Sequence, residues 1–363
     1  MRERRDLEYG VGAAAVAIDW GSYFNDFLKS YFNASLPTAI SASPFDKPAG
    51  IINLPPFLII LLITTLLIVG TRESTRVNNV IVAIKVAIVI FFIAVGVGHV
   101  KTANWHPFLP FGSGGIFAGA SLIFFAYIGF DQISTAAEEV RDPQRTMPLG
   151  ILFSLGICTV LYMLVAGVLT GIVPYKQLNN PSPVSHAMLQ IGITWAAKVI
   201  TVGAIAGLTT VLLALLFGQS RIFFAMSRDG LLPAIFSRIH PTLHTPFLSS
   251  LIVGVFVALL ASFTPIAQVA EMTNIGTLAA FILVSLAVWR LRVTRPDLPR
   301  GFRTPFVPVL PILSAIASFV LILSLEHLTW LRFVVWLAIG LVVYFLYSRH
   351  HSRLTTDLAR ESA

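Results

Sequence analysis

The chain has 363 residues, of which 56% are hydrophobic and only 12% are charged. Soluble domains carry roughly 25% charged residues, so this composition excludes an ordinary soluble protein and predicts an all-α polytopic membrane protein. The net charge of +8 at pH 7 does not indicate nucleic acid as a partner, because the basic residues lie between apolar runs and form no continuous patch. The single cysteine, Cys158, excludes an intrachain disulfide.

Apolar segments of roughly 20 residues, separated by proline, glycine and charged residues, predict ten transmembrane helices embedded in the lipid bilayer. The predicted spans are 9–31, 51–70, 79–100, 114–138, 149–173, 197–219, 246–264, 268–289, 309–325 and 329–347. The first and the fourth are the least uniformly apolar. Between the fifth and sixth spans, the run SPVSHAMLQI predicts a short helix on the outer surface.

The distribution of Lys and Arg gives the orientation, because these residues collect in cytoplasmic loops. With the N-terminus inside, 18 of the 25 Lys and Arg residues lie on the cytoplasmic side, six lie outside, and Lys85 lies within a span. This split supports ten spans with both termini cytoplasmic. The start of the chain, MRERRDLEYG, lacks the apolar core of a cleavable signal peptide.

Three carboxylates follow one line along the first span. Glu8, Asp19 and Asp26 are spaced 11 and 7 residues apart, which places them within about 20° of one another around a helix. They form either a functional acidic stripe or an interior face that packs against other helices, with Asp26 near the outer end. Glu271 lies near the outer end of the eighth span, where a boundary position is favoured over a site.

Lys85 lies in the third span, NNVIVAIKVAIVIFFIAVG, roughly 9 Å from its cytoplasmic start at a rise of about 1.5 Å per residue. Its side chain can extend to the inner interface while its stem stays in the apolar region. Alternatively, Lys85 binds and releases a proton, since ionisable groups inside a span are candidates for function. Both interpretations stay open.

The fourth span contains IFFAYIGFDQISTAAEEV, in which Gly129, Phe130 and Asp131 lie about midway. One interpretation is that Gly129 and the earlier glycines of this span let helices pack closely. The other is that the helix breaks at Gly129. A break in mid-membrane frees backbone groups that are tolerated only where they line a cavity, and secondary transporters bind substrate and ion at such breaks.

Several of these stretches resemble one family. IFFAYIGFDQISTAAEEVRDPQRTMPLGI, NNVIVAIKVAIVI, GQSRIFFAMSRDGLLP and RPDLPRGFRTPFVPVLP resemble the amino acid-polyamine-organocation permeases, specifically the bacterial cationic amino acid transporter-like branch. The resemblance covers nearly the whole chain. It implies the LeuT-like fold, with two inverted five-helix repeats followed by two further helices.

Within that fold, LEYGVGAAAVAI resembles the start of the third helix. The ten spans then correspond to helices three to twelve, and the first two helices are not in this chain. A late start codon, a fragment, and a shortened protein with another role are the three explanations. The expected organisation is a transporter core over 1–289, a cytoplasmic linker over 290–308, a C-terminal helix pair over 309–347 and a cytoplasmic tail over 348–363.

The resemblance also implies a substrate site in the fourth span. The main-chain carbonyls of Phe125, Ala126 and Ile128 would accept hydrogen bonds from the amino group of the substrate. Gly129 would permit the break, and Phe130 resembles the aromatic residue that closes over the bound substrate.

Lys85 matches a lysine that takes the place of a sodium ion in sodium-coupled relatives, and Glu8 matches a glutamate near that lysine. The resemblance therefore implies that Lys85 and Glu8 couple transport to protons. It leaves the transported amino acid open, because bacterial members of this branch often carry neutral amino acids. Thr209 and Thr210 are expected near the substrate pocket.

The function that follows is an amino acid permease of the cytoplasmic membrane that works by alternating access, is coupled to protons and needs no cofactor. The alternative is a non-transporting membrane sensor or an inactive fragment of a permease. An enzyme is not expected, because the predicted spans contain no His pair at helical spacing and no pairing of Ser with His across spans. The oligomeric state stays open.

Overall fold

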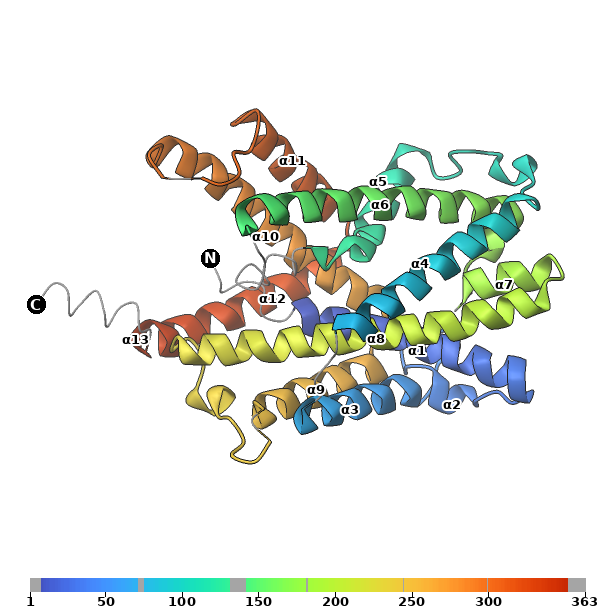
Figure 1. Cartoon of the computed structure of the whole chain (residues 1–363), viewed down its shortest axis with the longest axis horizontal. Coiled ribbons are helices and arrows are strands. Elements are labelled where there is room, and N and C mark those ends of the chain that lie inside the picture. Colours follow the sequence, from blue (N-terminus) through green and yellow to red (C-terminus); the bar gives the residue numbers. More distant parts are fainter. Residues whose placement is uncertain are drawn as a thin grey trace, which may run out of the picture.

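The computed structural model describes residues 8–70, 75–130, 142–180, 182–243, 245–298 and 300–351. In these ranges the protein is built from helices, and the only β pairing is an isolated bridge between Ser41 and Asn53. Figure 1 shows long helices running side by side, with α4 crossing α8 at an angle. The longer helices are α1 (Glu8–Phe32), α3 (Leu54–Val69), α4 (Thr75–Val97), α5 (Gly112–Ile123), α6 (Pro143–Ile172), α8 (Thr194–Arg228), α9 (Phe247–Phe263), α10 (Ile266–Thr294), α11 (Val309–Leu323) and α12 (His327–Val343).

Shorter helical segments connect them. These are α2 (Thr38–Ser41), η1 (Thr102–Trp105), η2 (Phe124–Tyr127), η4 (Tyr175–Gln177), α7 (Pro183–Gln190), η5 (Ala234–Ser237), η6 (Tyr344–Ser348) and α13 (Arg349–His351). Helix α7 is the short helix predicted from SPVSHAMLQI, and it packs against α8 with Ser185, Ala187 and Met188 buried.

Each of the ten predicted spans contains one of the longer helices. Five of the described helices are long and apolar enough to cross a membrane, namely Asn79–Val97, Pro143–Ile172, Thr194–Arg228, Ile266–Thr294 and His327–Ser348. Four more are apolar but shorter, namely Leu54–Val69, Gly112–Tyr127, Phe247–Phe263 and Val309–Leu323. The protein is therefore a multi-pass helical membrane protein, and the number of ten spans stays a prediction.

Several helices extend beyond the predicted spans, and α6 and α8 extend furthest. Helix α8 continues to Arg228, nine residues beyond the predicted end at position 219. Helix α6 begins at Pro143, six residues before position 149. The prediction followed the loss of apolar character, whereas a helix continues through polar residues until its backbone pattern is interrupted, as it is near Asp229 and Gly230.

The least apolar of the long helices, α1, is also among the most buried. Its small side chains include Ala13, Ala14, Ala15 and Ala17, which are fully buried and let neighbouring helices approach closely. Helices α3, α8 and α9 pack around α1 in one apolar cluster. Among the described polar side chains of α1, Asp19, Asn25 and Asp26 are half-buried and Lys29 is exposed.

Helix α8 runs antiparallel to α1, and two hydrogen bonds join them. The buried side chain of Gln219 accepts from the Gly10 backbone N–H at 2.8 Å, one of the N–H groups at the start of α1 that has no partner within the helix. Further along, Trp20 Nε1 donates to Thr209 Oγ1 at 2.9 Å.

The linker over 290–308 folds back on the end of α10. The guanidinium of Arg300 donates to the carbonyls of Leu291, Arg295, Pro296 and Leu298 at 2.6–3.1 Å. A cation at this end of a helix satisfies the last carbonyls and complements the helix dipole. Helices α11 and α12 then pack on α10 through a cluster that includes Ile275, Leu278 and Ile322.

Candidate functional site: the interruption after α5

Helix α5 stops being α-helical at Ile123. It tightens into the single 3-10 turn η2, and Ile128 then takes an extended conformation with φ −63° and ψ 136°. Gly129 follows at φ +114°, a region that side chains rarely adopt. The α-helix therefore ends before Gly129, and the break at Gly129 stays a prediction. Asp131 and the polar run after it lie outside the described residues.

No described atom supports the close-packing interpretation at Gly129. A Cβ built on Gly129 would have no described heavy atom within 4 Å, and the same is true for Gly114 and Gly119. Space is therefore available at all three positions. Only at Gly129 does the backbone conformation itself favour glycine.

Two of the three predicted carbonyls have partners within the protein. The Phe125 carbonyl accepts from the Ile128 N–H at 3.2 Å, and the Ala126 carbonyl accepts from the hydroxyl of Tyr162 in α6 at 3.0 Å. Among the described residues, the Ile128 carbonyl accepts no hydrogen bond. A carbonyl oxygen has two lone pairs, so all three can still accept from a ligand.

Aromatic rings surround the break. Phe281 in α10 lies 5.5 Å from Phe130 and 6.0 Å from Phe124, measured between ring centroids. Phe125 points to the other side, into the apolar cluster around α1. A Cβ on Gly12 of α1 would lie 3.9 Å from the Phe125 ring. The break thus lies between α1, α6 and α10.

Lys85 lies elsewhere, where α4 crosses α8. Its stem runs over Gly207, on which a Cβ would approach the Lys85 Cγ and Cε atoms to 3.5 Å. Gly207 therefore leaves room for the lysine stem. Within the described part of the chain, the Lys85 ammonium has neither a hydrogen bond nor an ion pair, and the residue is half-buried.

The structure does not bring the start of α1 close to Lys85. Gly10, two residues after Glu8, contacts Gln219, and Gln219 is twelve residues from Gly207, about 18 Å along α8 at a rise of about 1.5 Å per residue. The side chain of Glu8 itself lies outside the described residues. The predicted pairing of Glu8 with Lys85 therefore stays a prediction.

Two of the other ionisable residues in the predicted spans, Asp26 and Glu271, accept hydrogen bonds from other helices or loops. Asp26 accepts a hydrogen bond from Ser182, beside the start of α7, and Glu271 accepts one from Thr329 at 2.5 Å. Both residues lie near an end of their helices, α1 and α10. Asp19 is half-buried and has no hydrogen bond among the described residues. Thr209 is bound to Trp20 rather than free to face a ligand.

Sequence reasoning missed three residues at the break. These are Tyr162, Phe281 and Asn274, whose carboxamide contacts the end of α5. Asn274 carries a signal that could have found it, since a polar side chain in an apolar span is a candidate for function. The two aromatic residues carry none, because many aromatic residues occur in the spans.

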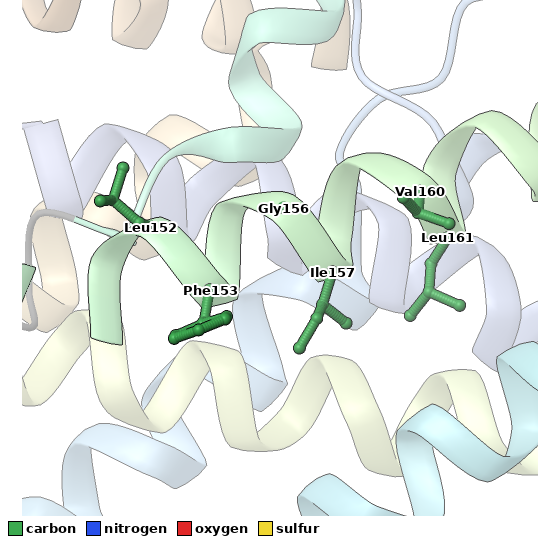
Figure 2. Close-up of a pocket in the computed structure, with 6 residues that line it drawn as sticks. All are labelled: Leu152, Phe153, Gly156, Ile157, Val160 and Leu161. Carbon is green, nitrogen blue, oxygen red and sulfur yellow. The ribbon is translucent and has the colours of Figure 1, made fainter. Parts of the chain in front are cut away.

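A hollow of about 350 Å³ lies along α6, away from the break. Its lining, shown in Figure 2, consists of Leu152, Phe153, Gly156, Ile157, Val160 and Leu161. Hydrocarbon side chains alone offer no group for an ammonium or a carboxylate, so this hollow does not qualify as the substrate site. Nor do the described residues contain a group of three or more potential metal ligands.

Comparison with known proteins identifies the family. The amino acid permease family model matches residues 9–351, which is nearly the whole chain. The chain belongs to the amino acid permease family. This permease is thus a transporter that moves amino acids across a membrane, and it is not an enzyme.

Two bacterial relatives support this assignment. The methylthioribose transporter of Bacillus subtilis (strain 168) is 50% identical over 348 residues, which cover 96% of this chain and 75% of the relative. The branched-chain amino acid permease BcaP of the same organism is 48% identical over 351 residues, again 96% and 75% of the two chains. A plant relative, the vacuolar cationic amino acid transporter 4 of Arabidopsis thaliana, is 40% identical over 299 residues, 80% of this chain and 49% of the relative.

Proposed function

We propose that this permease carries neutral, branched aliphatic amino acids into the cell by proton-coupled alternating access. The observation that carries the proposal is the break after α5, where a turn of 3-10 helix, an extended Ile128 and Gly129 at φ +114° interrupt an apolar helix. The carbonyls of Phe125, Ala126 and Ile128 would hold the substrate ammonium. An interruption of this kind is where secondary transporters bind their substrates.

The substrate class follows from the rings beside the break. Phe124, Phe130 and Phe281 form an apolar wall, which suits a hydrocarbon side chain and would penalise a charged one that lacks a partner. Phe130 would close over the substrate. One relative is named for branched-chain amino acids, in agreement with this chemistry.

Proton coupling is assigned to Lys85. Its ammonium is the candidate carrier because it lies in the α4–α8 contact, without an ion pair among the described residues, and such groups in membrane spans mark proton and ion pathways. Glu8, the second predicted coupling residue, is kept only as a prediction. Extension of Lys85 to the inner interface is the competing interpretation.

In the proposed arrangement the ten helices all span the cytoplasmic membrane, with both termini inside, as the Lys and Arg distribution predicts. The four shorter apolar helices have 15 to 17 residues, counting α5 and η2 together as 16. They approach the lower limit of about 17 residues for a span.

The test uses purified protein in proteoliposomes with an imposed pH gradient, acidic outside. Uptake of radiolabelled leucine should exceed that of empty liposomes, and an ionophore that collapses the gradient should abolish accumulation. Unlabelled valine and isoleucine should compete, whereas lysine should not. Leucine uptake that is indifferent to the gradient would refute proton coupling, and competition by lysine alone would refute the substrate class.

A second candidate substrate is methylthioribose, because a relative named for its transport is 50% identical to this chain. The two substrates share an apolar end but only the amino acid has an ammonium. Unlabelled methylthioribose in the same competition assay separates them, since inhibition stronger than that by valine would favour the second candidate.

A further inference from the structure

One carboxamide fastens the end of α5. Asn274 of α10 is fully buried, and its Nδ2 donates to the carbonyls of Ser121 at 2.7 Å and of Leu122 at 3.1 Å. The contact joins residues 152 and 153 positions apart in the sequence. It lies immediately before the point at which α5 becomes η2.

The position of this contact has a physical reason. The last carbonyls of an α-helix have no partner within the helix, and a change to 3-10 spacing alters which amides they meet. Asn274 supplies two donors to consecutive carbonyls at this change. It therefore stabilises an α5 that ends at Ile123 over one that continues through Phe125.

The same side chain is poorly satisfied. Its Oδ1 is buried and has no hydrogen-bond partner among the described residues, which costs free energy in a buried site. If residue 274 served only the stability of the fold, a side chain without an unpaired buried oxygen would be more favourable. The retained carboxamide points to a role in placing the break.

Helix α10 also holds the aromatic side of the break. Phe281 lies seven residues after Asn274, two turns further along the same face of α10, and contacts Phe124 and Phe130. One helix thus contacts both the backbone before the break and the rings beside it.

We propose that Asn274 is a positioning residue of the substrate site. Its carboxamide fixes where α5 stops being α-helical and so places the carbonyls of 125–128 and the ring of Phe130. The proposal rests on the proposed function, because it assumes that substrate binds at the break. Asn274 acts through this backbone and need not touch the substrate.

The chain offers a matched control at another helix end. Asn104 donates its Nδ2 to the consecutive carbonyls of Gly171 at 2.7 Å and Ile172 at 3.3 Å, at the end of α6. The chemistry is the same, but no predicted site residue is near. Asn274 is fully buried and Asn104 is half-buried, so the control matches the hydrogen bonds and not the burial. A purely structural role predicts that both variants lower thermal stability and leave the KM unchanged.

The main experiment compares Asn274→Asp with Asn104→Asp in leucine uptake by proteoliposomes. Aspartate keeps the volume of asparagine but cannot make both bonds, because an ionised carboxylate donates none and repels the carbonyls, and a protonated carboxyl donates only one. Asn274→Asp should raise the KM for leucine about tenfold, because misplaced backbone weakens binding, whereas Asn104→Asp should change KM by less than about twofold and lower only the thermal stability. A KM for Asn274→Asp within about twofold of wild type would overturn the proposal.

Amide hydrogen exchange tests the role of Asn274 independently of the proposed function, because the measurement needs no substrate. Asn274→Asp should speed amide exchange over 121–130, and Asn104→Asp should do so only near 171–173. Wild-type protein that takes up no leucine would contradict the proposed function, while the exchange result would still decide whether Asn274 fixes the break. Unchanged exchange over 121–130 in Asn274→Asp would overturn the inference.

Discussion

At the scale of single residues, Gly129 has the clearest physical requirement. Its φ of +114° disfavours any side chain although the surrounding space is open. Replacement should therefore act through the backbone and not through a clash with neighbours.

Gly129→Ala should destabilise the protein by about 1–3 kcal/mol, the usual cost of holding a side chain in such a region. Thermal unfolding of the protein in detergent measures the change. The matched control is Gly119→Ala within α5, where there is equal space and an α-helical backbone, so stability should stay the same or rise slightly. Equal unfolding temperatures for the two variants would contradict the strain assigned to Gly129.

Lys85→Gln tests proton coupling at the same scale. The variant keeps much of the stem over Gly207 but removes the charge, so it should lose accumulation driven by the pH gradient while keeping leucine exchange without a gradient. Lys198→Gln is the control, because that ammonium lies 5.1 Å over the Tyr31 ring, near the start of α8. Gradient-driven accumulation that survives in Lys85→Gln would favour simple extension to the interface.

The sequence predicted the residues of the break but not their partners. Gly129 was found because glycine in mid-span is a local signal. Tyr162, Asn274 and Phe281 reach the break from α6 and α10, and such contacts depend on how distant helices pack. Glu8 and Lys85 also lie on different helices, so their spacing along the chain does not give the distance between them.

At the scale of elements, η2 is held from two sides. Asn274 binds the carbonyls before it, and Tyr162 of α6 binds the Ala126 carbonyl within it. The turn is therefore attached to α10 and α6 together, and motion of either helix would move the proposed substrate carbonyls.

Tyr162→Phe removes one of these attachments. The lost hydrogen bond is worth about 0.5–1.5 kcal/mol, so the KM for leucine should rise about twofold to twelvefold. Tyr175→Phe serves as the control, since Tyr175 contacts Phe111 through its ring and its hydroxyl makes no hydrogen bond among the described residues. An unchanged or lowered KM in Tyr162→Phe would show that the hydroxyl does not hold η2 in place.

Helix existence was predictable from apolar length, and helix ends were not. Every predicted span contains a helix, yet α8 runs on to Arg228, where polar residues continue the helix beyond the apolar run. Arg221 illustrates the reason, because its guanidinium lies 4.0 Å over the Phe217 ring and so keeps a favourable contact within the helix. The length of an apolar run indicates how much of a helix can lie in lipid. Residues that stop a helix, such as Gly230 after α8, determine where the helix itself ends.

At the scale of the whole molecule, the proposed orientation can be measured directly. In a Cys158→Ser background, Ala103→Cys lies in the loop expected outside and Ala234→Cys in the loop expected inside, and both native side chains are exposed. A membrane-impermeant maleimide should label Ala103→Cys in intact cells and Ala234→Cys only after permeabilisation. The reverse pattern would invert the proposed topology.

The burial of α1 was the least predictable feature at this scale. Its carboxylates left open a functional stripe or an interior face, and only packing shows that α3, α8, α9 and α10 lie against it. Membership of the permease family, in contrast, follows from motifs spread along nearly the whole chain.

The measurement that tests the central claim most directly is leucine counterflow in proteoliposomes loaded with unlabelled leucine. Wild-type protein and Gly119→Ala should both exchange external radiolabelled leucine for internal leucine, and Gly129→Ala should lose this exchange. Exchange by Gly129→Ala at the wild-type rate would contradict a substrate site at the break after α5.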